Sequence, residues 1–229
     1  MLTIAGTARA AGNAAVAIAG VALQRIDLRG HRGVHPRMGA LDVLPFVPLG
    51  EATMPQAVEL ARETAKRIWD RYAIPSFLYG EAALVPERRP LPNVRPNPKG
   101  PPDVGDLPFH ATAGAIAIGA RRLLIAFNIE LATGDFNAVR CIVRRIRERD
   151  GGLGTLRAMA FRLRDDLTQV SLNITNERAT PLYRVFEVVR SLAAERGIRV
   201  TRGELIGCLP RSAVVSAALY AIGVEDTTV

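Results

Sequence analysis

The chain has 229 residues, of which 48% are apolar and 23% are charged. This length can bury the core of one large domain or two small ones, and the composition excludes a disordered or fibrous protein. The formal net charge of +8 comes almost wholly from arginine, because Lys66 and Lys99 are the only lysines. Arginine suits carboxylate or phosphate ligands, although a general bias of the proteome towards arginine also explains the charge.

Other features narrow the partners and the compartment. Aromatic residues make up only 5% of the chain, so a nucleic-acid-binding stripe is not expected. Cys141 and Cys208 are far apart and form no C-x-x-C pair, so we expect no zinc site, no disulfide and a reducing cytoplasm. The apolar run Ala14–Leu23 lacks the preceding basic cluster of a signal peptide, and no run approaches the about 18 residues of a membrane span.

The first half of the chain alternates strand and helix patterns. Thr53 and Gln56 have the spacing of a capping box ahead of a helix, and Pro55 suits its first turn. Two prolines in Leu41–Leu49 favour an edge strand or an irregular end. The predicted elements are a strand at Leu2–Ala5, a helix at Ala11–Ile26, a loop at Arg29–Gly39, a strand at Leu41–Leu49, a helix from Thr53 and a strand at Ser76–Tyr79.

A proline-rich stretch then runs from Pro86 to Pro108, with few apolar residues between the prolines. Such a composition argues against regular helices or strands. Two interpretations of this stretch stay open, a linker without a function of its own and a ligand-binding loop.

The second half repeats the alternation with clearer boundaries. Thr180-Pro181 reads as a helix cap and first position, and Gly151-Gly152 reads as a helix stop. The predicted elements are strands at Ala115–Ile118 and Leu123–Leu131, a helix at Asp135–Arg149, strands at Leu156–Leu163 and Leu167–Ile174, a helix from Thr180, a strand at Glu204–Leu209 and a helix from Pro210 to Ile222.

From Leu123 onward this order is the split βαβ pattern of ferredoxin-like domains. We therefore predict an α+β protein with two ferredoxin-like α/β sandwich subdomains, residues 1–119 and 120–229, the first of them incomplete. A ligand-binding cleft is expected between the two.

Two of the three histidines, His31 and His35, lie in one loop. Their spacing would suit a metal on a helix, but Gly33 and Pro36 argue against that helix, so no metal is predicted. The alternative is that His35 transfers protons near neutral pH. Arg32 and Arg37 would then hold carboxylates, and Asp42 would orient an imidazole. A histidine that only satisfies backbone groups remains an equal interpretation from the loop alone.

The segment His31–Pro48 resembles the signature HxGxHPRMGAxDVxPFxP of the formiminotransferase domain family. Further segments similar to that family are Tyr79–Ala82, Gly119–Arg121, Leu124–Asn128, Gln169–Asn173 and Glu204–Pro210. The resemblance implies a cytoplasmic enzyme that moves a formimino group from N-formimino-L-glutamate to tetrahydrofolate, its co-substrate, during histidine breakdown. It implies no membrane partner and leaves a homodimer open.

The same resemblance assigns roles to particular residues. His35 matches the family's catalytic acid/base, and Arg32, Arg37 and Asp42 surround it in the signature. A folate-binding loop is implied at Gly105–Gly114, and a second folate contact at Gly152–Met159. The residues named for these contacts are Gly105, His110, Thr112, Gly114, Gly152 and Met159.

One departure from the family concerns the start of the chain. Family members begin with a strand, a helix and a second strand that have no counterpart ahead of Met1 in this sequence. The first subdomain would then have an exposed sheet edge. The alternative function is accordingly a non-catalytic folate-binding relative, inactive through loss of these N-terminal elements.

Overall fold

The computed structural model describes residues 2–31, 37–95 and 97–224. The chain divides into two compact units. The first unit comprises Ile4–Arg122. The second unit begins at Leu123 and also includes the residues before Ile4. The boundary expected from the sequence, between Gly119 and Ala120, falls at the end of the last strand of the first unit.

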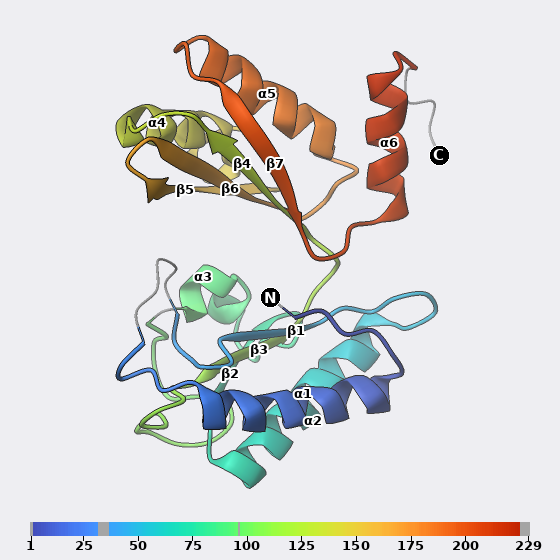
Figure 1. Ribbon diagram of the computed structural model, residues 1–229. Coiled ribbons are helices and arrows are strands. Elements are labelled where there is room, and N and C mark those ends of the chain that lie inside the picture. Colours follow the sequence, from blue (N-terminus) through green and yellow to red (C-terminus); the bar gives the residue numbers. More distant parts are fainter. Residues whose placement is uncertain (1, 32–36, 96, 225–229) are drawn as a thin grey trace. The chain divides into compact units, whose positions relative to one another are not determined.

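The first unit is built on a three-stranded sheet in the order β1-β3-β2 (Figure 1). Its strands are β1 (Val43–Phe46), β2 (Ser76–Gly80) and β3 (Ile116–Ala120). Both pairings are parallel, so each connection must return the chain to the same end of the sheet. Helix α2 (Met54–Tyr72) makes one crossover, and the segment 81–115 makes the other.

Two helices cover one face of this sheet (Figure 1). The predicted capping box starts α2: the N–H of Thr53 donates to the Gln56 side chain at 2.8 Å, and the Thr53 hydroxyl accepts from the Gln56 amide. Helix α1 (Ala8–Arg25) packs on α2 through small residues. A Cβ on Gly20 would lie 2.3 Å from the Tyr72 hydroxyl, so this close approach explains the alanine- and glycine-rich composition of α1.

The segment that connects β2 to β3 contributes to the opposite face. It contains the 3-10 turn η1 (Pro86–Arg88) and the short helix α3 (Leu91–Val94), and it is otherwise irregular. A small apolar cluster lies here, made of Met38, Phe77, Tyr79, Val94, Ala115 and Ala117. The central strand β3 is therefore buried on both faces, as its parallel pairing requires.

The second unit has a four-stranded antiparallel sheet in the order β5-β6-β4-β7. Strands β4 and β5 run parallel to each other with β6 between them, which confirms the predicted split βαβ pattern. Its elements are β4 (Ile125–Leu131), α4 (Phe136–Ile146), η2 (Glu148–Asp150), β5 (Leu156–Arg164), β6 (Leu167–Ile174), α5 (Leu182–Ala194), β7 (Val200–Ile206) and α6 (Arg211–Ala221).

Helices α4 and α5 cover one face of this sheet and enclose the main core of the unit (Figure 1). Alternate residues of β4, such as Ile125, Ile129 and Leu131, point into that core because successive side chains of a strand face opposite sides. The residues between them, Asn128 among them, lie on the face away from the helices.

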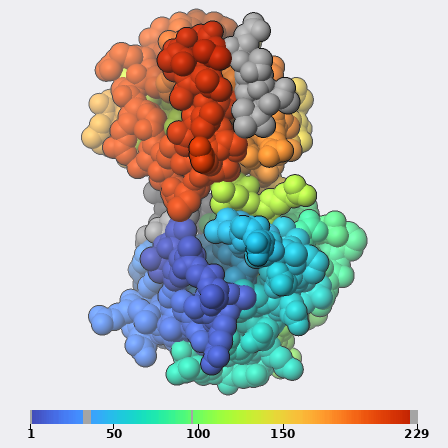
Figure 2. Space-filling view, turned by 90° about the vertical axis from the view of Figure 1, so that its right-hand side faces the viewer, coloured from blue at the N-terminus to red at the C-terminus, as the bar shows by residue number. Residues whose placement is uncertain are grey.

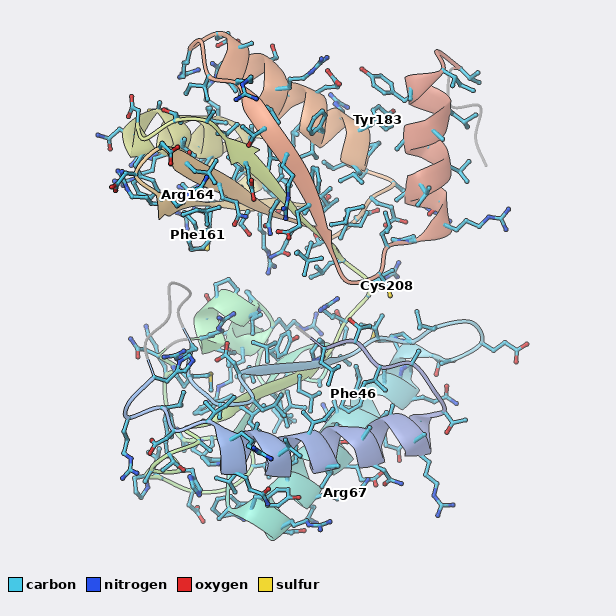
Figure 3. All side chains as sticks on the ribbon, in the orientation of Figure 1. Phe46, Arg67, Phe161, Arg164, Tyr183 and Cys208 are labelled. Atoms are coloured by element: carbon cyan, nitrogen blue, oxygen red, sulfur yellow. The ribbon has the colours of Figure 1, made fainter. Side chains whose placement is uncertain are left out.

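Helix α6 stands beside α5 rather than on the sheet (Figure 1). Ala213 is the one buried residue of α6. The exposed surface of this helix is dark red in Figure 2. The rings of Tyr183 and Tyr220 stack at 4.3 Å between centroids and join α5 to α6 (Figure 3). Among the described residues, no helix combines the length and apolar character needed to cross a membrane.

Several sequence predictions were wrong in detail. Leu2–Ala5 forms no strand, and its large side chains are exposed, Leu2 by 69%. The last strand begins at Val200 rather than Glu204, because it pairs with β4 along its whole length despite its polar start. Thr180 does not cap α5; Pro181 occupies that position, and the Thr180 hydroxyl donates to the carbonyl of Gly154.

The sheet of the first unit also differs from a ferredoxin-like sheet, whose neighbouring strands run antiparallel. The long crossover from β2 to β3 makes this pair parallel, and a pattern of strands and helices cannot show that direction. The α+β class and the two subdomains are confirmed. Strand β1 contains Pro45 and lies at the sheet edge, as its prolines predicted.

Candidate active site

The centre of the predicted site, Arg32 and His35, lies outside the described residues. The residues on either side of that gap, His31 and Arg37, are brought together: Nη2 of Arg37 donates to the backbone carbonyl of His31. This hydrogen bond holds His31 and Arg37 close together. Arg37 thus contacts the backbone among the described residues, and its binding of a substrate carboxylate stays a prediction.

Asp42 holds the backbone that follows the loop. The N–H groups of Met38 and Gly39 donate to its Oδ1 at 2.7 and 3.3 Å, and Nε of Arg95 lies 2.8 Å from its Oδ2. Both charged side chains are only about a quarter exposed, 22% for Asp42 and 25% for Arg95. Asp42 thus links the signature segment to the proline-rich segment. Its predicted contact with the imidazole of His35 is not tested.

The segment after the loop pairs with a distant part of the chain. The N–H of Ala115 donates to the Met38 carbonyl at 3.0 Å, and the N–H of Ala40 donates to the Ala113 carbonyl at 2.9 Å. Gly39 and Gly114 form an antiparallel bridge between these contacts. The two backbones approach so closely that a Cβ on Gly114 would lie 2.1 Å from the Met38 oxygen.

His110, Thr112 and Gly114 come together in one turn. The backbones of His110 and Gly114 exchange two hydrogen bonds, at 3.0 and 2.8 Å. Nδ1 of His110 accepts from the N–H groups of Thr112 and Ala113 at 3.3 and 3.2 Å. In the neutral ring the hydrogen then resides on Nε2, which can donate to a ligand. The turn therefore presents a fixed donor beside the anchored segment.

Gly105 is positioned by a different contact. Its φ is +90°, and a Cβ there would lie 2.5 Å from the ring of Trp69 in α2. Packing against Trp69 explains why this position is glycine. Its predicted role in folate binding remains a prediction.

The proline-rich segment is folded around a buried ion pair that sequence reasoning missed. Nη1 of Arg88 lies 2.6 Å from Oδ1 of Asp103, and the side chains are 15% and 6% exposed. Oδ2 of Asp103 also accepts from the N–H of Leu78 at 2.7 Å, while Nη2 of Arg88 donates to two carbonyls of the segment at 2.8 Å. A charge this deeply buried needs such partners. The presence of Arg88 and Asp103 in a proline-rich stretch was the signal in the sequence that could have predicted this ion pair.

Gly152 and Met159 belong to the second unit. A Cβ on Gly152 would lie 2.3 Å from the backbone of Ile146, so the end of α4 leaves no room for a side chain there. Met159 projects from β5 and is 52% exposed. Met159 is accessible to a ligand, and the folate contacts expected of both residues remain predictions.

A further set of polar residues lies on the sheet face away from α4 and α5. The side chain of Asn128 donates to Glu204 at 3.2 Å, and Glu204 pairs with Arg202 at 2.8 Å. Phe161 projects on this same side (Figure 3). Sequence reasoning did not name these residues as a site, although their alternation with core residues was the signal. The polar members of this face include Asn128, Glu130, Arg157, Gln169, Ser171, Asn173, Arg202 and Glu204.

An exposed ion pair precedes the loop. Nη2 of Arg29 lies 2.7 Å from Oδ2 of Asp27. The side-chain hydrogen bond from Arg29 lowers the pKa of Asp27, and the same bond raises the pKa of Arg29. Because folding lowers the pKa of Asp27, this weak stabilisation is present at neutral pH and lost as the pH falls through the acidic range.

The described residues contain no cluster of three or more metal-ligating side chains.

Both units match one family of proteins. A family profile described as the formiminotransferase domain, N-terminal subdomain, matches residues 1–121, and a second described as the formiminotransferase domain matches residues 126–229. The chain therefore belongs to the formiminotransferase domain family.

Individual relatives carry more specific names. A glutamate formimidoyltransferase from Thermoplasma acidophilum is 40% identical over 220 residues, covering 89% of this chain and 72% of the relative. One from Streptococcus pyogenes is 37% identical and covers 99% of this chain and 80% of the relative. A formimidoyltransferase-cyclodeaminase from Rattus norvegicus is 35% identical over 90% of this chain, which corresponds to 41% of that longer protein.

We expect Asp42→Asn to weaken the first unit. The asparagine keeps an oxygen that can accept from Met38 and Gly39, but it removes the charge that faces Arg95. Loss of a partly buried, charge-assisted contact should lower the free energy of unfolding by about 1–3 kcal/mol. Urea denaturation followed by the fluorescence of Trp69, the single tryptophan, measures this unit. The control is Asp27→Asn in the exposed pair, and an equal loss in both variants would contradict the role given to Asp42.

Proposed function

We propose that the chain transfers the formimino group of N-formimino-L-glutamate to tetrahydrofolate, with His35 moving the proton. Membership of the formiminotransferase family supports the reaction class. Two relatives that are 40% and 37% identical are named glutamate formimidoyltransferase, which supports the donor.

The chemistry requires one group that both takes and gives a proton. The amine nitrogen of tetrahydrofolate attacks the formimino carbon and loses a proton as the new C–N bond forms. The nitrogen of glutamate gains a proton as its bond to the same carbon breaks. A histidine that titrates near neutrality serves both steps, so His35 takes the first proton and supplies the second.

The observation that carries this proposal is the anchoring of the backbone next to His35. Met38, three residues further on, is held by Asp42 through its N–H and by Ala115 through its carbonyl. A proton-transfer group needs this kind of support, because small displacements of a reacting group cost large factors in rate. The anchored segment also runs beside the turn of His110 and Thr112, which is expected to contact folate.

Charged and polar residues would hold the two substrates. Arg32 and Arg37 would bind the carboxylates of formiminoglutamate through paired N–H···O contacts. Nε2 of His110, which carries the hydrogen in the neutral ring, would donate to an acceptor on the folate. Further contacts to folate are assigned to Gly105, Thr112, Gly114, Gly152 and Met159. We place this reaction in histidine breakdown in the cytoplasm, where exposed free thiols such as Cys141 and Cys208 persist.

The proposal is tested by combining a binding and a turnover measurement on the full chain. Tetrahydrofolate is titrated by calorimetry, and release of glutamate from formiminoglutamate is then followed in its presence. Binding with turnover is the expected result. Binding without turnover would favour the non-catalytic folate-binding relative instead, and absence of both would overturn the function.

A further inference from the structure

The second unit contains an open groove of about 230 Å³ between α4 and the edge strand β5. Four of its lining residues are arginines, and none of the described lining residues is acidic. Met159 and Ala160 of β5 line it on the strand side. The groove is therefore a strongly positive depression of a size that suits a small ligand.

Three of these arginines form a stripe along one side of α4. Arg140 and Arg144 lie four residues apart on one face of α4, and Arg147, the residue directly after the helix, follows three residues further on and also lines the groove. Like charges at these steps repel each other and destabilise a helix. An anion bound between the guanidinium groups would relieve this repulsion.

Neighbouring residues orient part of the groove. The side chain of Arg147 is 16% exposed, and its Nε donates to Oδ2 of Asp150. The terminal nitrogens of that guanidinium carry further hydrogens that a ligand can accept. At the other end, the guanidinium of Arg162 lies 5.6 Å from the centre of the Phe136 ring, which adds a fifth positive charge beside the groove.

The lining charge remains positive after the carboxylate that pairs with the lining arginines is included. Asp150 pairs with Arg147 and lies 3.9 Å from Arg149, so four lining arginines less one carboxylate leave a net charge of +3. Several guanidinium groups in one groove can each bind an oxyanion through two parallel N–H···O bonds. One monovalent anion would leave most of these donors unused.

We propose that the α4–β5 groove binds a small oligoanion with at least two oxyanion groups, through Arg140, Arg144 and Arg147. Phosphate and carboxylate groups share the required chemistry, so tripolyphosphate and citrate serve as the two probes. The groove shares Met159 with the proposed folate contacts. Binding of the two probes can be measured without folate and without turnover, so failure of this proposal is distinguishable from failure of the proposed function.

The test is isothermal titration of the full chain with each probe at low ionic strength, where surface charges are least screened. We expect one-to-one binding of at least one probe and a loss of at least tenfold in affinity in the double variant R140Q/R144Q. Tighter binding of tripolyphosphate by tenfold or more identifies a phosphate ligand, and comparable or tighter binding of citrate identifies a polycarboxylate.

A matched control separates a site from overall charge. The variant R178Q/R211Q removes two exposed arginines of the same unit that do not line the groove, and its affinity should stay within twofold of the parent. Equal weakening in both double variants, or no one-to-one binding of either probe, would overturn the proposal. The midpoint of thermal unfolding of R140Q/R144Q should change little, because both side chains are exposed, so the variant is expected to fold.

Discussion

Replacing His35 with alanine should lower the turnover number for formimino transfer by about 10²- to 10⁴-fold, the range expected for loss of a general acid–base group. The affinity for tetrahydrofolate should change by less than threefold, because the proposed folate contacts lie on other residues. Both substrates would still meet, but neither the attacking amine nor the departing glutamate nitrogen would have a positioned proton carrier.

Steady-state kinetics and calorimetric titration of His35→Ala, side by side with the parent chain, measure the two quantities. His31→Ala is the matched control, since it removes the other histidine of the same loop while keeping the backbone carbonyl that Arg37 contacts. We expect the control to keep its turnover within about fivefold, a difference of roughly 1 kcal/mol in activation free energy. Unchanged turnover in His35→Ala would contradict the catalytic role assigned to His35.

Replacing Gly114 with alanine should damage both stability and turnover. The φ of Gly114 is +68°, and an alanine there costs about 1–2 kcal/mol from backbone strain alone. In addition, its Cβ would lie 2.1 Å from the carbonyl oxygen of Met38, so the anchored segment has to move. Forcing such a shift adds about 1–3 kcal/mol and displaces the backbone that leads to His35.

Gly50→Ala isolates the clash from the strain. Gly50 lies in the same unit and has a φ of +60°, but nothing is within 4 Å of the Cβ that alanine would add. Urea denaturation followed by Trp69 fluorescence should therefore show a larger loss for Gly114→Ala than for Gly50→Ala, by about 1–3 kcal/mol. Turnover should fall only in Gly114→Ala. Similar losses of stability in the two variants, with turnover retained, would disprove the close pairing of the two segments.

Local signals in the sequence predicted much of the fold. The capping box at Thr53, the periodic apolar residues of α4 and the alternation in β4 each depend on neighbours within a few residues. Such patterns identify elements because side-chain direction repeats with a fixed period in helices and strands. Local sequence was ambiguous about the start of α5 at Thr180 and about the polar start of β7. Tertiary contacts determined where these two elements begin.

The candidate site divides in the same way. The loop sequence and its resemblance to a family singled out His35, Arg37 and Asp42 without knowledge of their surroundings. The partners of Asp42 could not be predicted, because Arg95 lies more than fifty residues away and in a proline-rich stretch without a periodic pattern. The same holds for the buried pair of Arg88 and Asp103.

The sequence by itself thus determined the α+β class, the order of most elements and the histidine loop with its arginines. The tertiary structure decided that the strands of the first unit run parallel, that Gly39 pairs with Gly114, and that the arginines of α4 line a groove with β5. The physical reason is that helix and strand periodicity comes from contacts near in sequence. Strand direction, close glycine packing and clustered charges arise only where distant segments meet.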